Sequence, residues 1–169
     1  MVIWIIGLSG SGKTYLAKNL FKNMREKKIM VDGDMVRKYI TYKLKYSIKD
    51  REKNSQLISD LCKFLEKQGF LVICSILSIF TKHQKINRKK FEDYFQIFIN
   101  SKISNLKNRN INKIYSKKNV VGKNIKFPKP YKNDLIIGND FKPYSQKKIN
   151  QIIKKINNVR KNKKKFKKL

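Results

Sequence analysis

The chain has 169 residues, of which 40% are hydrophobic, so one domain with one buried core is expected and disorder throughout is excluded. No apolar run approaches the roughly 20 residues that a membrane-spanning helix needs, and we expect a cytoplasmic protein without a membrane partner. The net charge of +31 arises from basic residues spread along the whole chain. This spread indicates a compositional bias and predicts, at most, nonspecific binding to nucleic acids.

Hydrophobic periodicity predicts strands that alternate with helices. In chain order these are a strand at 2–6, a helix at 13–27, a strand at 29–31, a short helical piece from 34, a helix at 50–68, a strand at 70–77, a helix end at 89–94, a strand at 95–99, a helix at 101–108, a strand at 135–137 and a helix from 145. The alternation is typical of an α/β fold with a parallel five-stranded sheet and helices on both faces.

Two segments lack this periodicity. Residues 110–132 contain Gly122, Pro128 and Pro130 and many polar side chains, which indicates a lid or a disordered loop. Residues 160–169 are mostly lysine and are expected to form a basic, flexible tail after a single domain at 1–159. Cys62 and Cys74 lack the spacing of metal ligands, so we expect two reduced core thiols.

The strongest motif is Gly7-Leu8-Ser9-Gly10-Ser11-Gly12-Lys13-Thr14, which fits the phosphate-binding pattern G-x-x-x-x-G-K-[ST] of P-loop proteins. It lies between a predicted buried strand and a predicted amphipathic helix, as such a loop requires. Backbone N–H groups of this loop would cradle the phosphates of ATP. Lys13 would reach the β- and γ-phosphates, and the Thr14 hydroxyl would ligate Mg²⁺. The ATP-binding residues expected from the motif are Gly7, Ser9, Gly10, Ser11, Gly12, Lys13 and Thr14.

A turn with two carboxylates, Asp32-Gly33-Asp34, follows the second predicted strand. At the carboxyl end of a parallel strand it would face the phosphate loop. A carboxylate there would hold Mg²⁺ through water or accept the proton of an attacking hydroxyl. Arg37 lies one helical turn further on, and Arg51 and Asn54 share one face of the long predicted helix. Together these side chains suit an anionic acceptor that carries a hydrogen-bonding base.

With these motifs the chain resembles the adenylyl-sulfate kinase family. The family's G-L-S-G-S-G-K-[ST] is present at 7–14 and its D-G-D-x-x-R at 32–37. Its F-S…D-R-x-E-N appears as Tyr46-Ser47…Asp50-Arg51-Glu52-Lys53-Asn54, and its I-S-P-Y as residues 77–80. The K-N-F-T-G of the family's lid appears at 118–122, with a tyrosine before it at Tyr115. The resemblance covers roughly residues 3–137.

The resemblance implies a magnesium-dependent kinase that uses ATP to phosphorylate the 3′-hydroxyl of adenosine 5′-phosphosulfate in sulfate activation. It implies that Lys13 and Asp34 are catalytic, that Thr14 and Asp34 hold the metal, and that Arg109 lies on the ATP side. Members of the family are often dimers, so a homodimer is one oligomeric state that it implies. The residues assigned to the acceptor are Asp32, Arg37, Tyr46 (stacked on the adenine), Arg51, Asn54, Ser78 and, from the lid, Lys118.

The chain departs from the family at several of these motifs. Lys53 replaces the glutamate of D-R-x-E-N, and Gln56 and Leu57 replace the two arginines that usually follow the asparagine of that motif. Val120 replaces the aromatic residue of the lid. Two alternatives therefore stay open at this point. One is a P-loop kinase for another small hydroxylated metabolite, such as a sugar or nucleoside derivative. The other is a nucleotide-dependent protein that binds nucleic acid, an alternative suggested by the net charge of +31.

Overall fold

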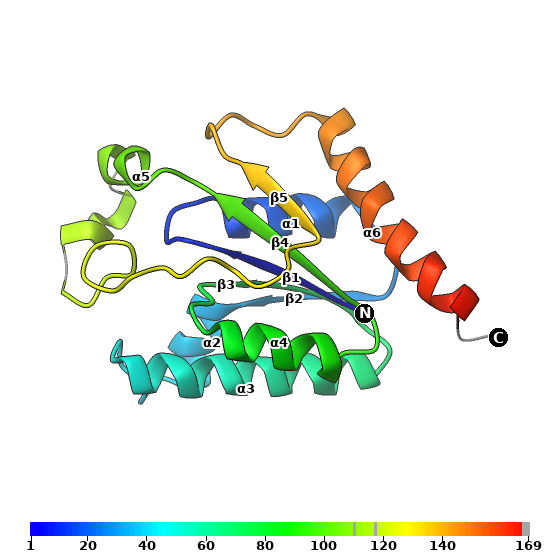
Figure 1. Ribbon diagram of the computed structural model, residues 1–169, viewed down its shortest axis with the longest axis horizontal. Helices are drawn as coiled ribbons and strands as arrows, with labels where there is room; N and C mark the ends of the chain where they lie inside the picture. The colour runs from blue at the N-terminus through cyan, green and yellow to red at the C-terminus, as the bar shows by residue number, and fades with distance from the viewer. Residues whose placement is uncertain (110, 117, 167–169) are drawn as a thin grey trace.

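The computed structural model describes residues 1–109, 111–116 and 118–166, apart from the side chains of residues 109, 111–113 and 161–166. Strands and helices alternate along the chain as expected (Figure 1). The elements are β1 (Val2–Gly7), α1 (Lys13–Asn23), β2 (Lys28–Asp32), α2 (Gly33–Tyr39), α3 (Ile48–Lys67), β3 (Leu71–Ile76), α4 (Thr81–Lys90), β4 (Tyr94–Asn100), α5 (Ile103–Arg109), the 3-10 helix η1 (Ile111–Ser116), β5 (Leu135–Gly138) and α6 (Gln146–Phe166).

The five strands form one parallel sheet in the order β2-β3-β1-β4-β5. The central strand β1 pairs with β3 on one side and β4 on the other, so that Ile5 lies opposite both Ser75 and Ile97. Because all strands run the same way, their carboxyl ends meet at one edge of the sheet. Gly7, Asp32 and the residues after Ile76 lie at that edge, and the predicted fold class is confirmed.

Two hydrophobic layers hold the helices to the two faces of the sheet (Figure 1). Successive side chains of a strand point to opposite faces. Ile3 and Ile5 of β1 therefore pack with α1 and α6, whereas Trp4 and Ile6 pack with α2 and α3. Cys62 and Cys74 are buried in the second layer as free thiols, as predicted.

The main difference from the sequence prediction concerns α4. The sequence indicates only a helix end at 89–94, whereas the helix runs from Thr81 to Lys90 and Tyr94 already begins β4. The buried residues of α4 are the polar His83, Gln84 and Asn87. The first turns of this helix therefore lack the hydrophobic periodicity from which a helix is predicted.

The C-terminal helix α6 continues to Phe166, so the boundary drawn between 159 and 160 falls inside a helix. Its apolar side chains Ile149, Ile152 and Ile156 are buried against the sheet and α1. Within the described part of the chain, no helix is both long and apolar enough to span a membrane.

Candidate nucleotide and acceptor site

The predicted phosphate loop connects the end of β1 to the start of α1. Gly10 and Gly12 have φ angles of 76° and 90°, a left-handed conformation that glycine adopts without steric cost. At Gly7 a Cβ atom would lie 2.8 Å from the carbonyl oxygen of Ile99, so only glycine fits between β1 and β4 at this point. The loop therefore has the backbone that its sequence pattern requires.

Lys13, the first residue of α1, folds back over the loop. Its Nζ donates a hydrogen bond of 2.7 Å to the carbonyl oxygen of Leu8. Desolvation lowers the pKa of Lys13 from 10.5 to about 8, although the nearby carboxylates of Asp34 and Asp32 act in the opposite direction. A lysine that folds back over a phosphate-binding loop is placed to meet the phosphates of a nucleotide.

Thr14 contacts Asp32, not Asp34. The Thr14 hydroxyl donates to Oδ2 of Asp32 at 2.8 Å, and the Ser75 hydroxyl donates to the same oxygen at 2.7 Å. The other oxygen, Oδ1, caps α2 by accepting from the backbone N–H of Asp34 at 3.0 Å and of Met35 at 3.3 Å. Burial alone would raise the pKa of Asp32, but these four hydrogen bonds outweigh burial and lower it. Asp32 is therefore a carboxylate fixed in place and charged.

Asp34 has a different environment from Asp32, although the two are only two residues apart. Its side chain is exposed at the start of α2. Its negative charge acts on both Lys13 and Arg51, where it opposes the lowering of each pKa by desolvation. Asp34 thus faces the space between the phosphate loop and the predicted acceptor residues.

Arg37, Tyr46 and Arg51 lie together, as the sequence predicted. The guanidinium carbons of Arg37 and Arg51 are 5.1 and 5.3 Å from the centre of the Tyr46 ring, which is 55% exposed. Arg37 donates to the backbone carbonyls of Leu44 and Lys45, and Nε of Arg51 donates to the carbonyl of Tyr46 at 3.0 Å. Desolvation, followed by the positive charge of Arg37, lowers the pKa of Arg51. Two cations and an exposed aromatic ring make a surface suited to an anionic group next to a base.

The other predicted acceptor residues, Asn54, Ser78 and Lys118, lie on different elements of the structure. Asn54 is 4% exposed, and its Oδ1 accepts from the Thr41 hydroxyl, which ties α3 to the loop after α2. Ser78 is 2% exposed just beyond β3, and its carbonyl and hydroxyl oxygens accept from Nε2 of Gln84. Lys118 is exposed. The side chain of Arg109 lies outside the described residues.

The described residues of the predicted lid pack onto the phosphate loop. Leu8 of the loop shares a buried cluster with Tyr115, Val120 and Val121. The N–H groups of Arg51 reach the same segment, since Nη2 donates to the carbonyl of Asn119 at 2.9 Å. Val120, which replaces the aromatic residue of the family's lid, packs into the cluster with Leu8 and is 6% exposed. The segment joins the phosphate side of the site to the side that carries Arg51.

Ser75 is a site residue that sequence reasoning missed. It holds Asp32 from the neighbouring strand β3, and it is 2% exposed. The one available signal was a hydroxyl side chain near the end of an otherwise apolar strand, Leu71-Val72-Ile73-Cys74-Ser75-Ile76. That signal indicates a contact with Asp32 only when β2 and β3 are known to be neighbouring strands.

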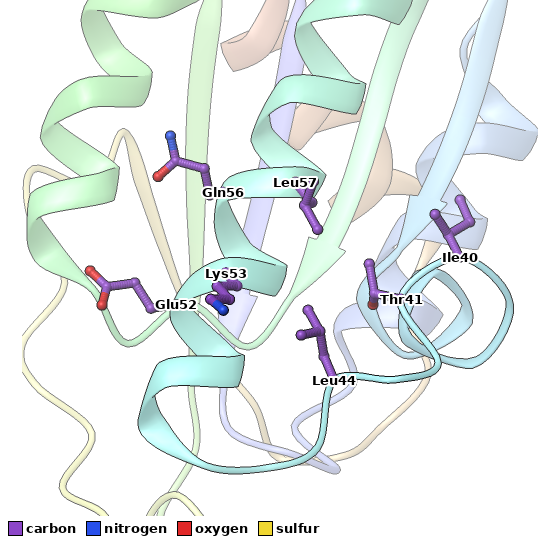
Figure 2. Close-up of a pocket in the computed structure, with 7 residues that line it drawn as sticks. All are labelled: Ile40, Thr41, Leu44, Glu52, Lys53, Gln56 and Leu57. Atoms are coloured by element: carbon purple, nitrogen blue, oxygen red, sulfur yellow. The ribbon is translucent and has the colours of Figure 1, made fainter.

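An open groove with a volume of about 570 Å³ lies between α3 and the loop that follows α2 (Figure 2). Lys53, Gln56 and Leu57, three of the positions at which the chain departs from the family motifs, line it from α3. Ile40 and Leu44 line it from the loop. These three departures are thus gathered on one surface beside the acceptor residues, whereas Val120 lies in the cluster on the phosphate loop.

Comparison with known proteins decides the family. Residues 1–137 match the family model described as adenylylsulphate kinase. The chain belongs to this family. It is therefore a kinase, a phosphotransferase with a hydroxyl group as acceptor, and the predicted resemblance is confirmed.

Individual relatives of this chain differ in how much of it they match. A cytidine diphosphoramidate kinase of Campylobacter jejuni is 33% identical over 92% of this chain and 95% of its own length. An adenylyl-sulfate kinase of Gloeothece citriformis is 30% identical over 69% of this chain and 68% of its own length. The structure of the Mycobacterium tuberculosis APS kinase in complex with AMPPNP and APS has a TM-score of 0.84 at 22% identity, covering 92% of this chain and 96% of that one, which confirms the fold.

Proposed function

We propose that the enzyme transfers the γ-phosphoryl group of ATP to a ribose hydroxyl of an anionic nucleotide. The position of Asp34 is the observation that carries this proposal. Its backbone N–H donates to Asp32 at 3.0 Å, and Asp32 accepts from Thr14 beside the phosphate loop at 2.8 Å. The exposed carboxylate of Asp34 acts from there on Lys13 of the phosphate loop and on Arg51 of the aromatic and basic surface. A hydroxyl group held on that surface would therefore meet the carboxylate beside the phosphates of ATP.

Asp34, Lys13 and the phosphate loop have separate roles in this reaction. Asp34 accepts the proton of the acceptor hydroxyl, whose oxygen attacks the γ-phosphorus in line. The bond from that phosphorus to the β,γ-bridging oxygen breaks, and ADP leaves. Lys13 and the inward N–H groups of the loop stabilise the charge that develops on the phosphoryl oxygens.

Mg²⁺ fits the side chains on the phosphate side. The Thr14 hydroxyl and the Asp32 carboxylate lie 2.8 Å apart and offer the hard oxygen ligands that this ion prefers. Among the described residues, no group of three or more His, Cys, Asp or Glu side chains is placed to hold a metal. A site that completes its shell with water and nucleotide phosphates agrees with that finding. The contact favours Asp32 over Asp34 as the carboxylate on the metal side, and the bound ion would neutralise phosphate charge.

The acceptor predicted from the sequence is adenosine 5′-phosphosulfate, phosphorylated on its 3′-hydroxyl to give 3′-phosphoadenosine 5′-phosphosulfate. The proximity of Arg37 and Arg51 supports an acceptor with a phosphosulfate-like charge. The exposed ring of Tyr46 between them supports a stacked base.

A second candidate acceptor is cytidine diphosphoramidate. It is favoured by the Campylobacter jejuni kinase of that name, because the similarity to that protein covers 92% of this chain. It is also favoured by the orientation of Val120, which packs into the cluster on the phosphate loop and offers no second ring for an adenine.

A coupled assay of ADP release separates the two acceptors. Purified enzyme is given Mg-ATP and either adenosine 5′-phosphosulfate or cytidine diphosphoramidate, with Lys13→Ala as the blank. The acceptor with the higher kcat/KM is the substrate. If neither gives turnover above the blank while ATP binding is intact, the nucleotide acceptor is refuted and another small hydroxylated metabolite takes its place.

A further inference from the structure

Two carbonyl groups of the phosphate loop are held from outside by side chains that are distant in the sequence. The hydroxyl of Tyr115 donates to the carbonyl oxygen of Ser9 at 2.8 Å. The side-chain amide of Asn139 donates from Nδ2 to the carbonyl oxygen of Ser11. These partners are separated by 106 and 128 residues along the chain. Neither donor residue, Tyr115 or Asn139, belongs to the phosphate-binding motif itself.

The geometry of the peptide bond gives these contacts a consequence for the inner side of the loop. A trans peptide unit is planar, with the carbonyl of one residue and the N–H of the next pointing in opposite directions. Because Tyr115 holds the carbonyl of Ser9, it also fixes the N–H of Gly10, which points in the opposite direction. In the same way, the carbonyl of Ser11 fixes the direction of the N–H of Gly12.

Such support is needed most at glycine. Gly10 and Gly12 are the two left-handed residues of the loop, with φ angles of 76° and 90°. Glycine populates positive and negative φ about equally, so its peptide units turn over more readily than those of other residues. A loop that is rich in glycine therefore does not keep its N–H groups convergent by local preference alone.

We propose that Tyr115 and Asn139 are positioning residues that hold the N–H groups of Gly10 and Gly12 toward the triphosphate. The proposal rests on the assignment of this loop as the ATP site. It adds one residue from the lid segment and one from the loop after β5 to the apparatus that binds phosphate. Neither residue touches the nucleotide in this role, because each acts through a backbone carbonyl.

Both side chains are themselves fixed, as positioning residues must be. Tyr115 is 8% exposed, and its ring shares a buried cluster with Leu8 of the loop. Asn139 follows β5 directly and continues the sheet, since its backbone N–H donates to the carbonyl of Asn100 at 3.1 Å. Its Oδ1 accepts from the N–H of Phe141 at 2.8 Å, which leaves Nδ2 turned toward the phosphate loop.

Tyr115→Phe tests the proposal because it removes the hydroxyl and keeps the ring in the cluster. Two probes are titrated calorimetrically, Mg-ATP and inorganic Mg-tripolyphosphate, the second of which reports on the phosphate loop alone. Tyr94→Phe is the matched control. It removes a buried tyrosine hydroxyl that donates to Gln96 at 2.7 Å, at the start of β4 and away from the loop.

Loss of one neutral hydrogen bond predicts that Tyr115→Phe binds both probes about two- to tenfold more weakly. Tyr94→Phe is expected to lower the melting temperature and to leave both affinities unchanged. Asn139→Leu removes the second donor independently and is expected to weaken the same two probes. Wild-type affinity of Tyr115→Phe and Asn139→Leu for tripolyphosphate would overturn the proposal.

The outcomes also distinguish this proposal from the proposed function. Binding of tripolyphosphate that weakens in both variants, in an enzyme that phosphorylates neither nucleotide acceptor, supports the positioning role and refutes the acceptor. Turnover of an acceptor with tripolyphosphate binding unchanged in both variants refutes the positioning role and supports the function.

Discussion

The two halves of the site are built differently. On the phosphate side, Leu8, Tyr115 and Val121 are buried, and two carbonyls of the loop accept hydrogen bonds from residues more than 100 positions away. On the acceptor side, Tyr46 is 55% exposed, and Arg37 and Arg51 donate to loop carbonyls five to eight residues away in sequence. Arg51 also donates to the carbonyl of Asn119 in the lid segment, which joins this side to the phosphate side.

This difference indicates which half can change during evolution. A change in the phosphate loop disturbs distant contacts and the core together, whereas a change in the loop between α2 and α3 alters a local surface. The departures Lys53, Gln56 and Leu57 all lie in the groove on that surface. We therefore expect ATP binding to resemble that of the family and acceptor preference to be the property that diverges.

The largest expected effect is on the phosphate side. Lys13→Ala should reduce kcat/KM by about a thousandfold, because the transferring phosphoryl group loses its cation. Steady-state ADP release measures the loss, and circular dichroism checks the fold. Lys22→Ala, an exposed lysine of the same helix, is the control and should be unaffected. Activity of the Lys13 variant within tenfold of wild type would mean that the loop has another role.

Replacement of Asp34 tests its proposed role between the phosphate side and the acceptor side. Asp34→Asn should lower kcat by about a hundredfold and change the KM for ATP much less, because the carboxylate acts on the hydroxyl proton. The comparison of the two constants is the measurement. Asp60→Asn, at an exposed carboxylate of α3, is the control. A rise in the KM for ATP as large as the fall in kcat would assign Asp34 to metal binding or structure.

A smaller effect is expected on the acceptor side alone. Tyr46→Ala should raise the KM for the acceptor about ten- to hundredfold through loss of base stacking and leave the KM for ATP unchanged. Tyr39→Ala, at a neighbouring exposed tyrosine, is the control. If both Michaelis constants rise together, the two halves are coupled and the comparison above fails.

The smallest effect concerns pH. Since the pKa of Lys13 is lowered to about 8, its amine is charged at pH 7 and neutral at pH 9. The Kd for Mg-ATP should therefore increase by at most about tenfold between these values, as the charged fraction falls. Lys13→Arg, whose side chain stays charged throughout, should lack this dependence. A wild-type Kd that is constant across the range would contradict the lowered pKa.

Sequence patterns predicted the parallel sheet and the backbone of the phosphate loop. A strand, a glycine loop and a helix in succession specify a local backbone, and residues 7–14 adopt it. The predicted neighbours Arg37, Tyr46 and Arg51 are also brought together, because a short loop and a helix separate them by few residues. Helix α4 was largely missed, because its buried residues are polar and leave no hydrophobic pattern.

The sequence by itself predicted the nucleotide loop from the spacing within one short segment, the α/β class from the alternation of strands and helices, and the family from the motifs that the chain shares with it. Only the tertiary structure decided that Thr14 and Ser75 meet at Asp32, and that Tyr115 and Asn139 reach the loop. These contacts depend on the strand order β2-β3-β1-β4-β5. Local periodicity cannot encode that order, because it is set by which strands and helices bury their apolar faces together.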